Sequence, residues 1–144
     1  MRVFFDTSVL VAAIVEAHPR HAQAVSWLRR ARSGEVEFLA ASHSLAELYS
    51  TLTTLPSRPR ISPAAAWRLV RDNVAASAHL VSLSPAEYTA TLERAAETAL
   101  AGGVVYDALI ARAAEIEGAD CFLMFNAADF RRISPEIESI LVIP

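Results

Sequence analysis

Four acidic residues of this chain stand at positions where a carboxylate could take part in chemistry. Asp6 directly follows a β-branched and aromatic run at residues 3–5, and Asp129 lies shortly after an apolar run at residues 121–125. Glu47 and Asp107 stand in the early turns of two segments with helical periodicity. Like charges about 4 Å apart repel by roughly 1 kcal/mol in water and by several times that in a partly dry cleft. If the four carboxylates gather in the fold, we expect a cation among them.

The cation that such a site would take is Mg²⁺ or Mn²⁺, because oxygen ligands without histidine suit hard cations. A metal held by carboxylates can activate water and polarise a phosphate, which is the chemistry of phosphodiester hydrolysis. The four histidines, His18, His21, His43 and His79, show no acid-flanked spacing typical of a zinc site. His18 and His21 flank a turn before a helix, and we expect them to be exposed to solvent.

Each of the four acids also has a purely structural interpretation. Asp6 and Asp107 could be helix N-caps, since an N-cap carboxylate accepts a hydrogen bond from a free backbone N–H. Glu47 could lie on a solvated helix face, and Asp129 could form a turn. Capping and metal binding are compatible for Asp6, because one carboxylate oxygen can serve each role.

Strands and helices alternate along the sequence. The pattern predicts strands at residues 2–5, 36–40, 79–83, 120–125 and 140–143. It predicts helices at residues 8–16, 21–33, 44–55, 85–101 and 107–117. A further helix is predicted to begin at Pro63, with Ser62 as its N-cap. Strands separated by helices imply crossover connections. We therefore expect an α/β fold, a three-layer α/β/α sandwich with a mostly parallel sheet of about five strands, as a single domain over residues 1–144.

This fold would bring the acids together at one edge of the sheet. Ligands of parallel sheets bind outside the carboxyl ends of the strands. Asp6 and Asp129 follow the first and fourth strands, and Glu47 is near the start of the helix that leaves the second. The helix of Asp107 must run back along the sheet to feed a parallel strand, which places its first turn at the same edge. We therefore expect all four acids on one rim.

Composition narrows the class of protein. The chain has a net charge of −3, which argues against a protein that coats nucleic acid, but all 13 of its basic residues are arginine. Arginine is a good bidentate ligand of phosphate, and Arg131 and Arg132 next to Asp129 are our candidates for phosphate contacts. The lone Cys121 lies in an apolar run, which predicts a buried thiol and a reducing, cytoplasmic environment. No apolar run approaches the roughly 20 residues of a membrane span.

Four motifs in order carry a family resemblance. These are FFDTSVLVA, SLAELYSTL, VYDALIARAA and FNAADF, which together extend over essentially the whole chain. With them the chain resembles PIN-domain ribonucleases and, more narrowly, the VapC-type toxins of bacterial toxin–antitoxin pairs. Position by position, the resemblance identifies Asp6, Glu47 and Asp107 with the three regular acids of the family and Asp129 with its fourth, more variable one. Asn126 matches the asparagine ahead of that fourth acid.

The resemblance implies a PIN-like endoribonuclease that hydrolyses RNA with Mg²⁺ or Mn²⁺ and leaves a 5′-phosphate and a 3′-hydroxyl. It also implies a homodimer and a VapB-like antitoxin as partner. One position departs from the pattern: the family often has Thr or Ser where this chain has Met124, and a thioether cannot donate a hydroxyl hydrogen bond. Asn126, together with Ser8 or Thr7 beside Asp6, could supply such bonds instead.

Other functions stay open at this stage. A catalytically silent PIN-like module that binds RNA or protein is one alternative, and a DNA nuclease of the same fold is another, since no residue pattern reads a 2′-hydroxyl. Enzymes that use a strand-end aspartate as phosphoryl acceptor normally add a lysine, and this chain has none. Tyr49 and Trp67 could serve a docking surface, but we expect both to pack in the core.

Overall fold

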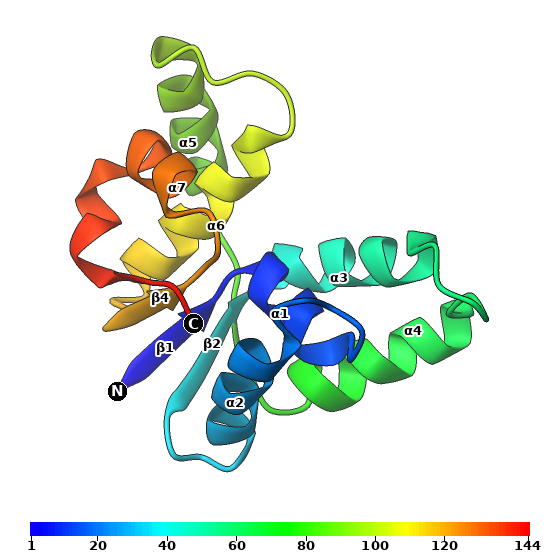
Figure 1. Cartoon of the computed structure of the whole chain (residues 1–144). Coiled ribbons are helices and arrows are strands. Elements are labelled where there is room, and N and C mark those ends of the chain that lie inside the picture. The colour runs from blue at the N-terminus through cyan, green and yellow to red at the C-terminus, as the bar shows by residue number, and fades with distance from the viewer.

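A five-stranded parallel sheet forms the centre of the computed structural model, which describes residues 1–144 (Figure 1). Its strands are β1 (Arg2–Phe5), β2 (Glu37–Ala41), β3 (His79–Val81), β4 (Cys121–Leu123) and β5 (Leu141–Val142). They are arranged in the order β3-β2-β1-β4-β5, and every neighbouring pair is parallel. The predicted α/β fold with five mostly parallel strands is confirmed.

The central strand β1 is apolar on both faces because helices cover both sides of the sheet. Val3, Phe4 and Phe5 are all fully buried, which is typical of a central parallel strand. Phe4 packs edge-on against Phe122 of β4, with 5.5 Å between ring centroids, and Phe5 packs against Phe38 of β2 at 4.8 Å. Since successive side chains of a strand point to opposite faces, the core is divided into two clusters, one on each side.

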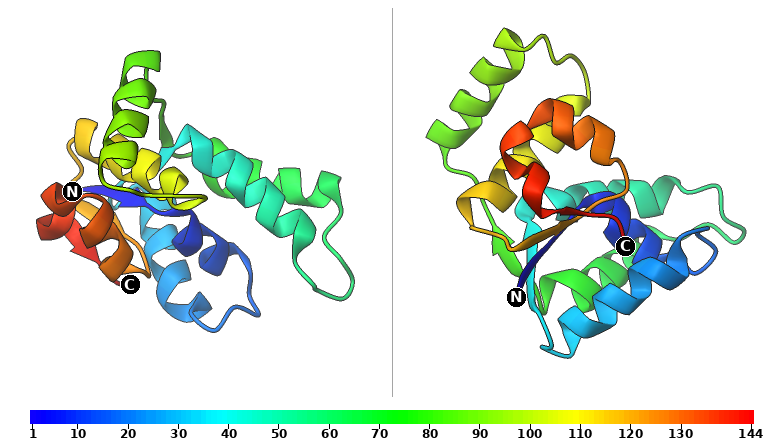
Figure 2. Two further views of the ribbon diagram at one scale, coloured as in Figure 1. Left: turned by 90° about the horizontal axis from the view of Figure 1, so that it is seen from above. Right: turned by 60° about the vertical axis from the view of Figure 1, so that its left-hand side comes forward.

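One face is covered by α1 (Thr7–Ile14), α2 (His21–Arg32), α3 (Ser42–Thr54) and α4 (Pro63–Val70), which a π-helical segment extends over Arg71–Ala75. Leu48 and Leu52 of α3 are fully buried, as their spacing on one helical face predicts. Figure 2 shows α3 and α4 side by side, extending past the sheet. The predicted start of α4 is confirmed, since the Ser62 hydroxyl accepts a hydrogen bond from the Ala65 N–H at 3.2 Å.

The other face is covered by α6 (Val104–Ile116), α7 (Ala127–Ile133) and the 3₁₀ helix η2 (Pro135–Ile140). Alanines of α6 lie directly against the sheet, where their small side chains let the helix approach closely. The remaining helix, α5 (Pro85–Glu97), lies outside this layer, and of its residues only Ala95 is buried (Figure 1). The molecule is therefore a three-layer sandwich with one outlying helix.

Several element boundaries differ from the predicted ones. The helix expected over residues 85–101 ends at Glu97, and Ala99 just beyond it adopts a left-handed φ of 56°. The next helix begins at Val104 rather than Asp107, so Asp107 lies within its first turn and is not its N-cap. Asp129 lies in a helix, α7, and not in a turn, with Asn126 as the N-cap residue.

The burial of single residues was predicted with mixed success. Cys121 is buried, as expected. Tyr49 and Trp67 are 40% and 49% exposed, so the expectation that they pack in the core was wrong. They lie on α3 and α4, the pair that extends past the sheet, where no layer covers their outer sides. None of the helices combines the length and the apolar character that crossing a bilayer requires.

Candidate active site

Asp6 lies at the carboxyl end of β1 and starts α1. Its backbone N–H donates to Leu123 O at 2.9 Å, which holds it against the neighbouring strand β4. Its Oδ2 accepts hydrogen bonds from the Ser8 backbone N–H, at 3.1 Å, and from the Ser8 hydroxyl, so the capping role is present. The residue is 6% exposed. Burial raises the pKa of Asp6 above its ordinary value, against the opposing effect of the Ser8 hydrogen bonds.

Glu47 of α3 is held by Thr7 of α1. Thr7 Oγ1 lies 3.0 Å from Glu47 Oε1 and 2.9 Å from Ser44 Oγ. Because a carboxylate can only accept, the single proton of Thr7 goes to Glu47, and the Ser44 hydroxyl donates to Thr7. Thr7 and Ser44 are both buried, so this chain of hydroxyls is shielded from water. Sequence analysis considered Thr7 only as a possible hydroxyl donor beside Asp6, and no sequence pattern indicated its contact with Glu47.

His43 approaches Glu47 from one turn earlier on the same helix. Its Nε2 lies 3.6 Å from Glu47 Oε1 and is buried without a hydrogen-bond partner. Its ring stacks on Tyr106 of α6, with 5.0 Å between centroids and 22° between planes. The His43 imidazole and the Thr7 hydroxyl thus both approach the same oxygen, Oε1, of Glu47.

Asp107 lies in the first turn of α6 and is half-buried. Its pKa is raised to about 6, chiefly by burial and further by the negative charges of Asp6, Glu47 and Asp129. The ordinary value is 3.8, so this carboxyl keeps its proton to a higher pH than a free aspartic acid does. The four predicted acids therefore act on one another electrostatically, although they come from four separate parts of the chain.

Three of the acids line a single open pocket of about 350 Å³ at the carboxyl edge of the sheet. Asp6, Glu47 and Asp107 contribute its carboxylates, and its other lining residues are Thr7, Ser8, Val11, His18, Thr51 and Phe125. No group of three or more His, Cys, Asp or Glu side chains is tight enough to enclose an ion directly. Mg²⁺ keeps several of its waters when it binds to proteins, so a Mg²⁺ site does not require three side chains that ligate the ion directly.

Asp129 lies on α7 and does not line this pocket. The Asn126 side-chain amide donates to its Oδ2, and the Asp129 backbone N–H donates back to Asn126 Oδ1 at 3.4 Å. Its other oxygen lies 3.7 Å from Arg132 Nη2. Arg132 is therefore beside the acid group, whereas Arg131 pairs with Glu138 of η2 at 3.1 Å.

His18 is half-buried and lines the pocket, so the expectation that it is solvent-exposed was wrong. His21 is half-buried as well, with its Nδ1 2.9 Å from Ala12 O. Met124, which stands where the family often has a hydroxyl, is fully buried in the core between the sheet and α6. Its side chain is thus an apolar packing group, and the hydroxyl bond to Asp6 comes from Ser8.

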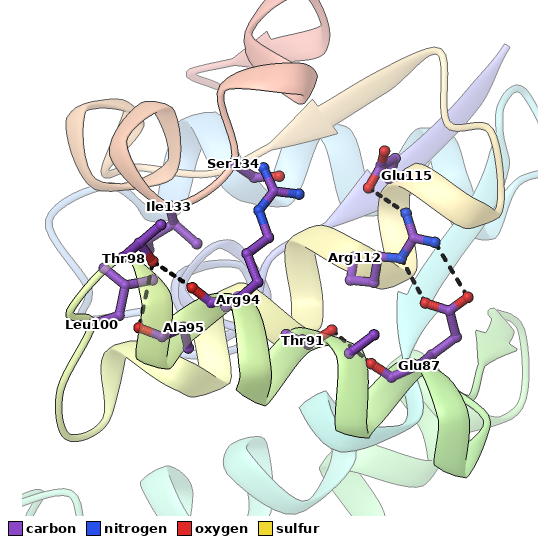
Figure 3. Close-up of a pocket in the computed structure, with 12 residues that line it drawn as sticks. Glu87, Thr91, Arg94, Ala95, Thr98, Leu100, Arg112, Glu115, Ile133 and Ser134 are labelled. Carbon is purple, nitrogen blue, oxygen red and sulfur yellow. Dashed lines mark hydrogen bonds and ion pairs between the residues drawn. The ribbon is translucent and has the colours of Figure 1, made fainter.

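A second pocket, of about 270 Å³, lies between α5 and α6 (Figure 3). Its charged side chains are already paired. Arg112 bonds Glu87 through Nε and Nη2, at 2.7 and 3.2 Å, and Glu115 through Nη1 at 2.7 Å, while Arg94 pairs with Glu136. Since these cations and carboxylates neutralise one another, the uncompensated charge is in the acidic pocket, which is the better candidate for an active site.

Comparisons with known proteins identify the family of the chain. A family model described as PIN domain matches residues 3–134. Ribonuclease VapC27 of Mycobacterium tuberculosis (strain ATCC 25618 / H37Rv) is 38% identical over 109 residues, which are 76% of this chain and 74% of that protein. Ribonuclease VapC40 of Mycobacterium tuberculosis (strain CDC 1551 / Oshkosh) is 37% identical over 137 residues, 94% of this chain and 96% of that protein.

Among solved structures, the crystal structure of VapBC2 from Rickettsia felis, bound to a DNA fragment from its promoter, has a similar fold. The TM-score is 0.64 at 19% sequence identity, over 100% of this chain and 99% of the other. The family model and the two mycobacterial relatives cover most of the chain. The chain therefore belongs to the PIN-domain family and, within it, to the VapC proteins.

Proposed function

We propose that this chain is a divalent-metal-dependent endoribonuclease, the toxin of a toxin–antitoxin pair. The observation that carries the proposal is the convergence of Asp6, Glu47 and Asp107 on one pocket at the carboxyl edge of the sheet. The mycobacterial relatives are named ribonucleases, which supports RNA as the substrate.

Mg²⁺ or Mn²⁺ is the proposed cofactor. Asp6, Glu47 and Asp107 would hold it from inside the pocket, with Asp129 adding negative charge from α7. The donors are oxygens, as a hard cation requires. Burial raises the pKa of both Asp6 and Asp107, and neighbouring carboxylates add to the effect, so a bound positive charge would be favourable there. When bound, the ion would supply polarisation of the scissile phosphate and activation of water.

The protein residues around these acids would fix their orientation. Ser8 occupies one oxygen of Asp6 and leaves the other free, and Thr7 holds one oxygen of Glu47. Asn126 does the same for Asp129. Such outer hydrogen bonds set the direction of metal-binding carboxylates and matter for affinity as well as activity.

A VapB-like antitoxin and a second copy of this chain are the proposed protein partners. The family to which the chain belongs supports both. The exposed aromatic side chains Tyr49 and Trp67 on α3 and α4 add apolar surface that a partner could cover.

The direct test is incubation of the purified protein with RNA in Mg²⁺, in Mn²⁺ and in EDTA, with analysis of the product ends. We expect cleavage only with metal, yielding 5′-phosphate and 3′-hydroxyl ends. Activity that survives EDTA, or that is equal in wild type and Asp6→Asn, would refute the proposal. RNA binding that is independent of the acids, without any cleavage, would instead indicate a silent binding module.

A further inference from the structure

Three side chains form a small aromatic and cationic cluster, which we call the Phe125 cluster: His18, Arg20 and Phe125. Two of them, His18 and Phe125, line the acidic pocket. The His18 ring is nearly parallel to that of Phe125, with 12° between planes and 6.3 Å between centroids. The Arg20 guanidinium carbon lies 4.6 Å from the centroid of the same phenyl ring. This is the geometry of a cation–π contact.

The cluster joins two segments that are far apart in sequence. Phe125 follows β4, while His18 and Arg20 belong to the connection between α1 and α2. The His18 ring is fixed because its Nδ1 accepts a hydrogen bond from the Arg20 backbone N–H at 3.1 Å. A neutral His18 therefore carries its proton on Nε2, where it can donate.

Arg20 has no carboxylate partner. The ion pairs of the chain include Arg131 with Glu138 and Arg132 with Asp129, but none involves Arg20. Its side chain is exposed and is placed by Phe125 rather than by an acid. Next to a pocket lined with three carboxylates, it is a cation left free for another anion.

The cluster is adjacent to the proposed reaction centre, because His18 and Phe125 line the same pocket as Asp6, Glu47 and Asp107. A polyanion bound at the acids would lie close to these two side chains. Aromatic rings and arginine planes beside a basic group are what unpaired nucleotides bind, through base stacking and phosphate contacts.

We propose that the Phe125 cluster is a nucleotide subsite that stacks an unpaired base of single-stranded RNA and contacts its phosphate through Arg20. This inference rests on the proposed ribonuclease function and adds the residues that hold the substrate beside the cut. It also makes Arg20 a better candidate for a phosphate contact than Arg131, whose guanidinium is paired with Glu138.

The test is binding of a short fluorescein-labelled single-stranded RNA in EDTA, where metal-dependent cleavage cannot occur, measured by anisotropy across a salt series. Arg20→Gln should weaken binding and reduce the salt slope by about 0.7, the value for one phosphate contact on a single strand. Arg29→Gln is the matched control, because Arg29 is an exposed arginine without an ion-pair partner about 13 Å further along α2. It should leave the slope unchanged.

Stacking is tested with the same RNA carrying 2-aminopurine, whose fluorescence is quenched when it stacks. Phe125→Leu keeps the apolar volume but removes the aromatic face, and we expect roughly tenfold weaker binding with loss of the quenching. Thermal unfolding checks that this half-buried position still permits folding, and Arg20→Gln, at an exposed position, tests the subsite independently.

The outcomes separate the subsite from the proposed function. If wild type cuts RNA with metal but Arg20→Gln and Phe125→Leu bind like wild type, the subsite is refuted and the ribonuclease proposal stands. Conversely, if the wild-type protein binds RNA through the cluster but never cuts it, the ribonuclease proposal is refuted and the subsite stands. A wild type that does not bind the RNA at all overturns the subsite.

Discussion

Thr7 and Glu47 are 40 residues apart in sequence, yet the Thr7 hydroxyl donates to Glu47 Oε1 at 3.0 Å. The contact joins the first turn of α1 to the early part of α3. Because Thr7 directly follows Asp6, a single short segment both contributes one carboxylate to the pocket and orients a second. The positions of Asp6 and Glu47 in the pocket therefore both depend on the start of α1.

Thr7→Val should weaken metal binding and RNA cleavage by about 10- to 100-fold, the usual effect of losing a hydrogen bond to a metal-binding side chain. Valine keeps the shape of threonine and loses only the hydroxyl, so Glu47 would lose its donor. Mn²⁺ affinity by calorimetry and cleavage rates both report the change. Thr7→Ser restores the hydroxyl and should recover most of both quantities, whereas equal losses in the two variants would argue against this role.

Asp6→Asn separates capping from metal binding. Asparagine is as good an N-cap as aspartate, so the side chain can still accept the Ser8 N–H and the melting temperature should not fall. Cleavage should fall by more than about 100-fold, since the variant loses a proposed metal ligand and not merely a residue that orients one. Asp6→Ala, as a comparison, should lose about 1 kcal/mol of stability in addition. Substantial activity in Asp6→Asn would show that Asp6 is a cap only.

Asp107 should make the metal-free protein less stable as pH rises. Its pKa is about 6 in the folded chain against an ordinary value of 3.8, so the native state binds the proton more tightly than the unfolded state does. The contribution to the unfolding free energy therefore falls between about pH 4 and pH 6. Asp107→Asn removes this term, and its melting temperature in EDTA should exceed that of wild type increasingly across the same window, by about 3 °C for each kcal/mol.

Glu93→Gln is the charge-matched control for that pH series. Glu93 is an exposed residue of α5 that lies outside the acidic pocket, so removing its charge should shift the melting temperature little at any pH. A stability difference between wild type and Asp107→Asn that does not depend on pH would contradict the electrostatic explanation.

Added metal should reverse the effect. A divalent ion at about 100 times its dissociation constant stabilises the folded state by about 2.7 kcal/mol. Mn²⁺ should therefore raise the melting temperature of wild type above pH 6 and that of Asp107→Asn much less. A thermal shift assay with Mn²⁺ and Mg²⁺ measures this without requiring any activity, and equal shifts in both proteins would mean that the ion binds elsewhere.

The two arginines of α7 should differ in their effect on RNA binding. Arg131 pairs with Glu138, and Arg132 lies 3.7 Å from Asp129 at the acidic rim. Both arginines have an acidic partner, but Arg131 is held more closely and by an acid outside the rim. Arg132→Gln should therefore weaken binding and flatten its salt dependence, while Arg131→Gln should change binding less. Anisotropy titrations of both variants against the same single-stranded RNA measure the difference. A larger loss with Arg131→Gln would show that its ion pair opens for the substrate.

Local sequence patterns determined the order of the elements and the fold class. The β-branched and aromatic residues 3–5 predicted β1 at its observed bounds, and the Ser62 and Pro63 pair predicted the start of α4. The four family motifs led to the prediction that Asp6, Glu47, Asp107 and Asp129 form the site, and the first three of these line one pocket. The order of the elements and the edge on which the acids lie follow from local residue patterns and from the parallel topology of the sheet. They can therefore be predicted without knowing how the helices pack.

Other features were decided only by tertiary packing. The helix α7 has seven residues, too few for a clear periodicity, and the exposure of Trp67 depends on how far α4 extends past the sheet. Thr7 was not recognised as a support for Glu47, nor were His18 and Phe125 as lining of the acidic pocket. Their roles arise from distances between segments far apart in sequence, which the angles and separations of packed helices determine and which no short-range residue pattern specifies.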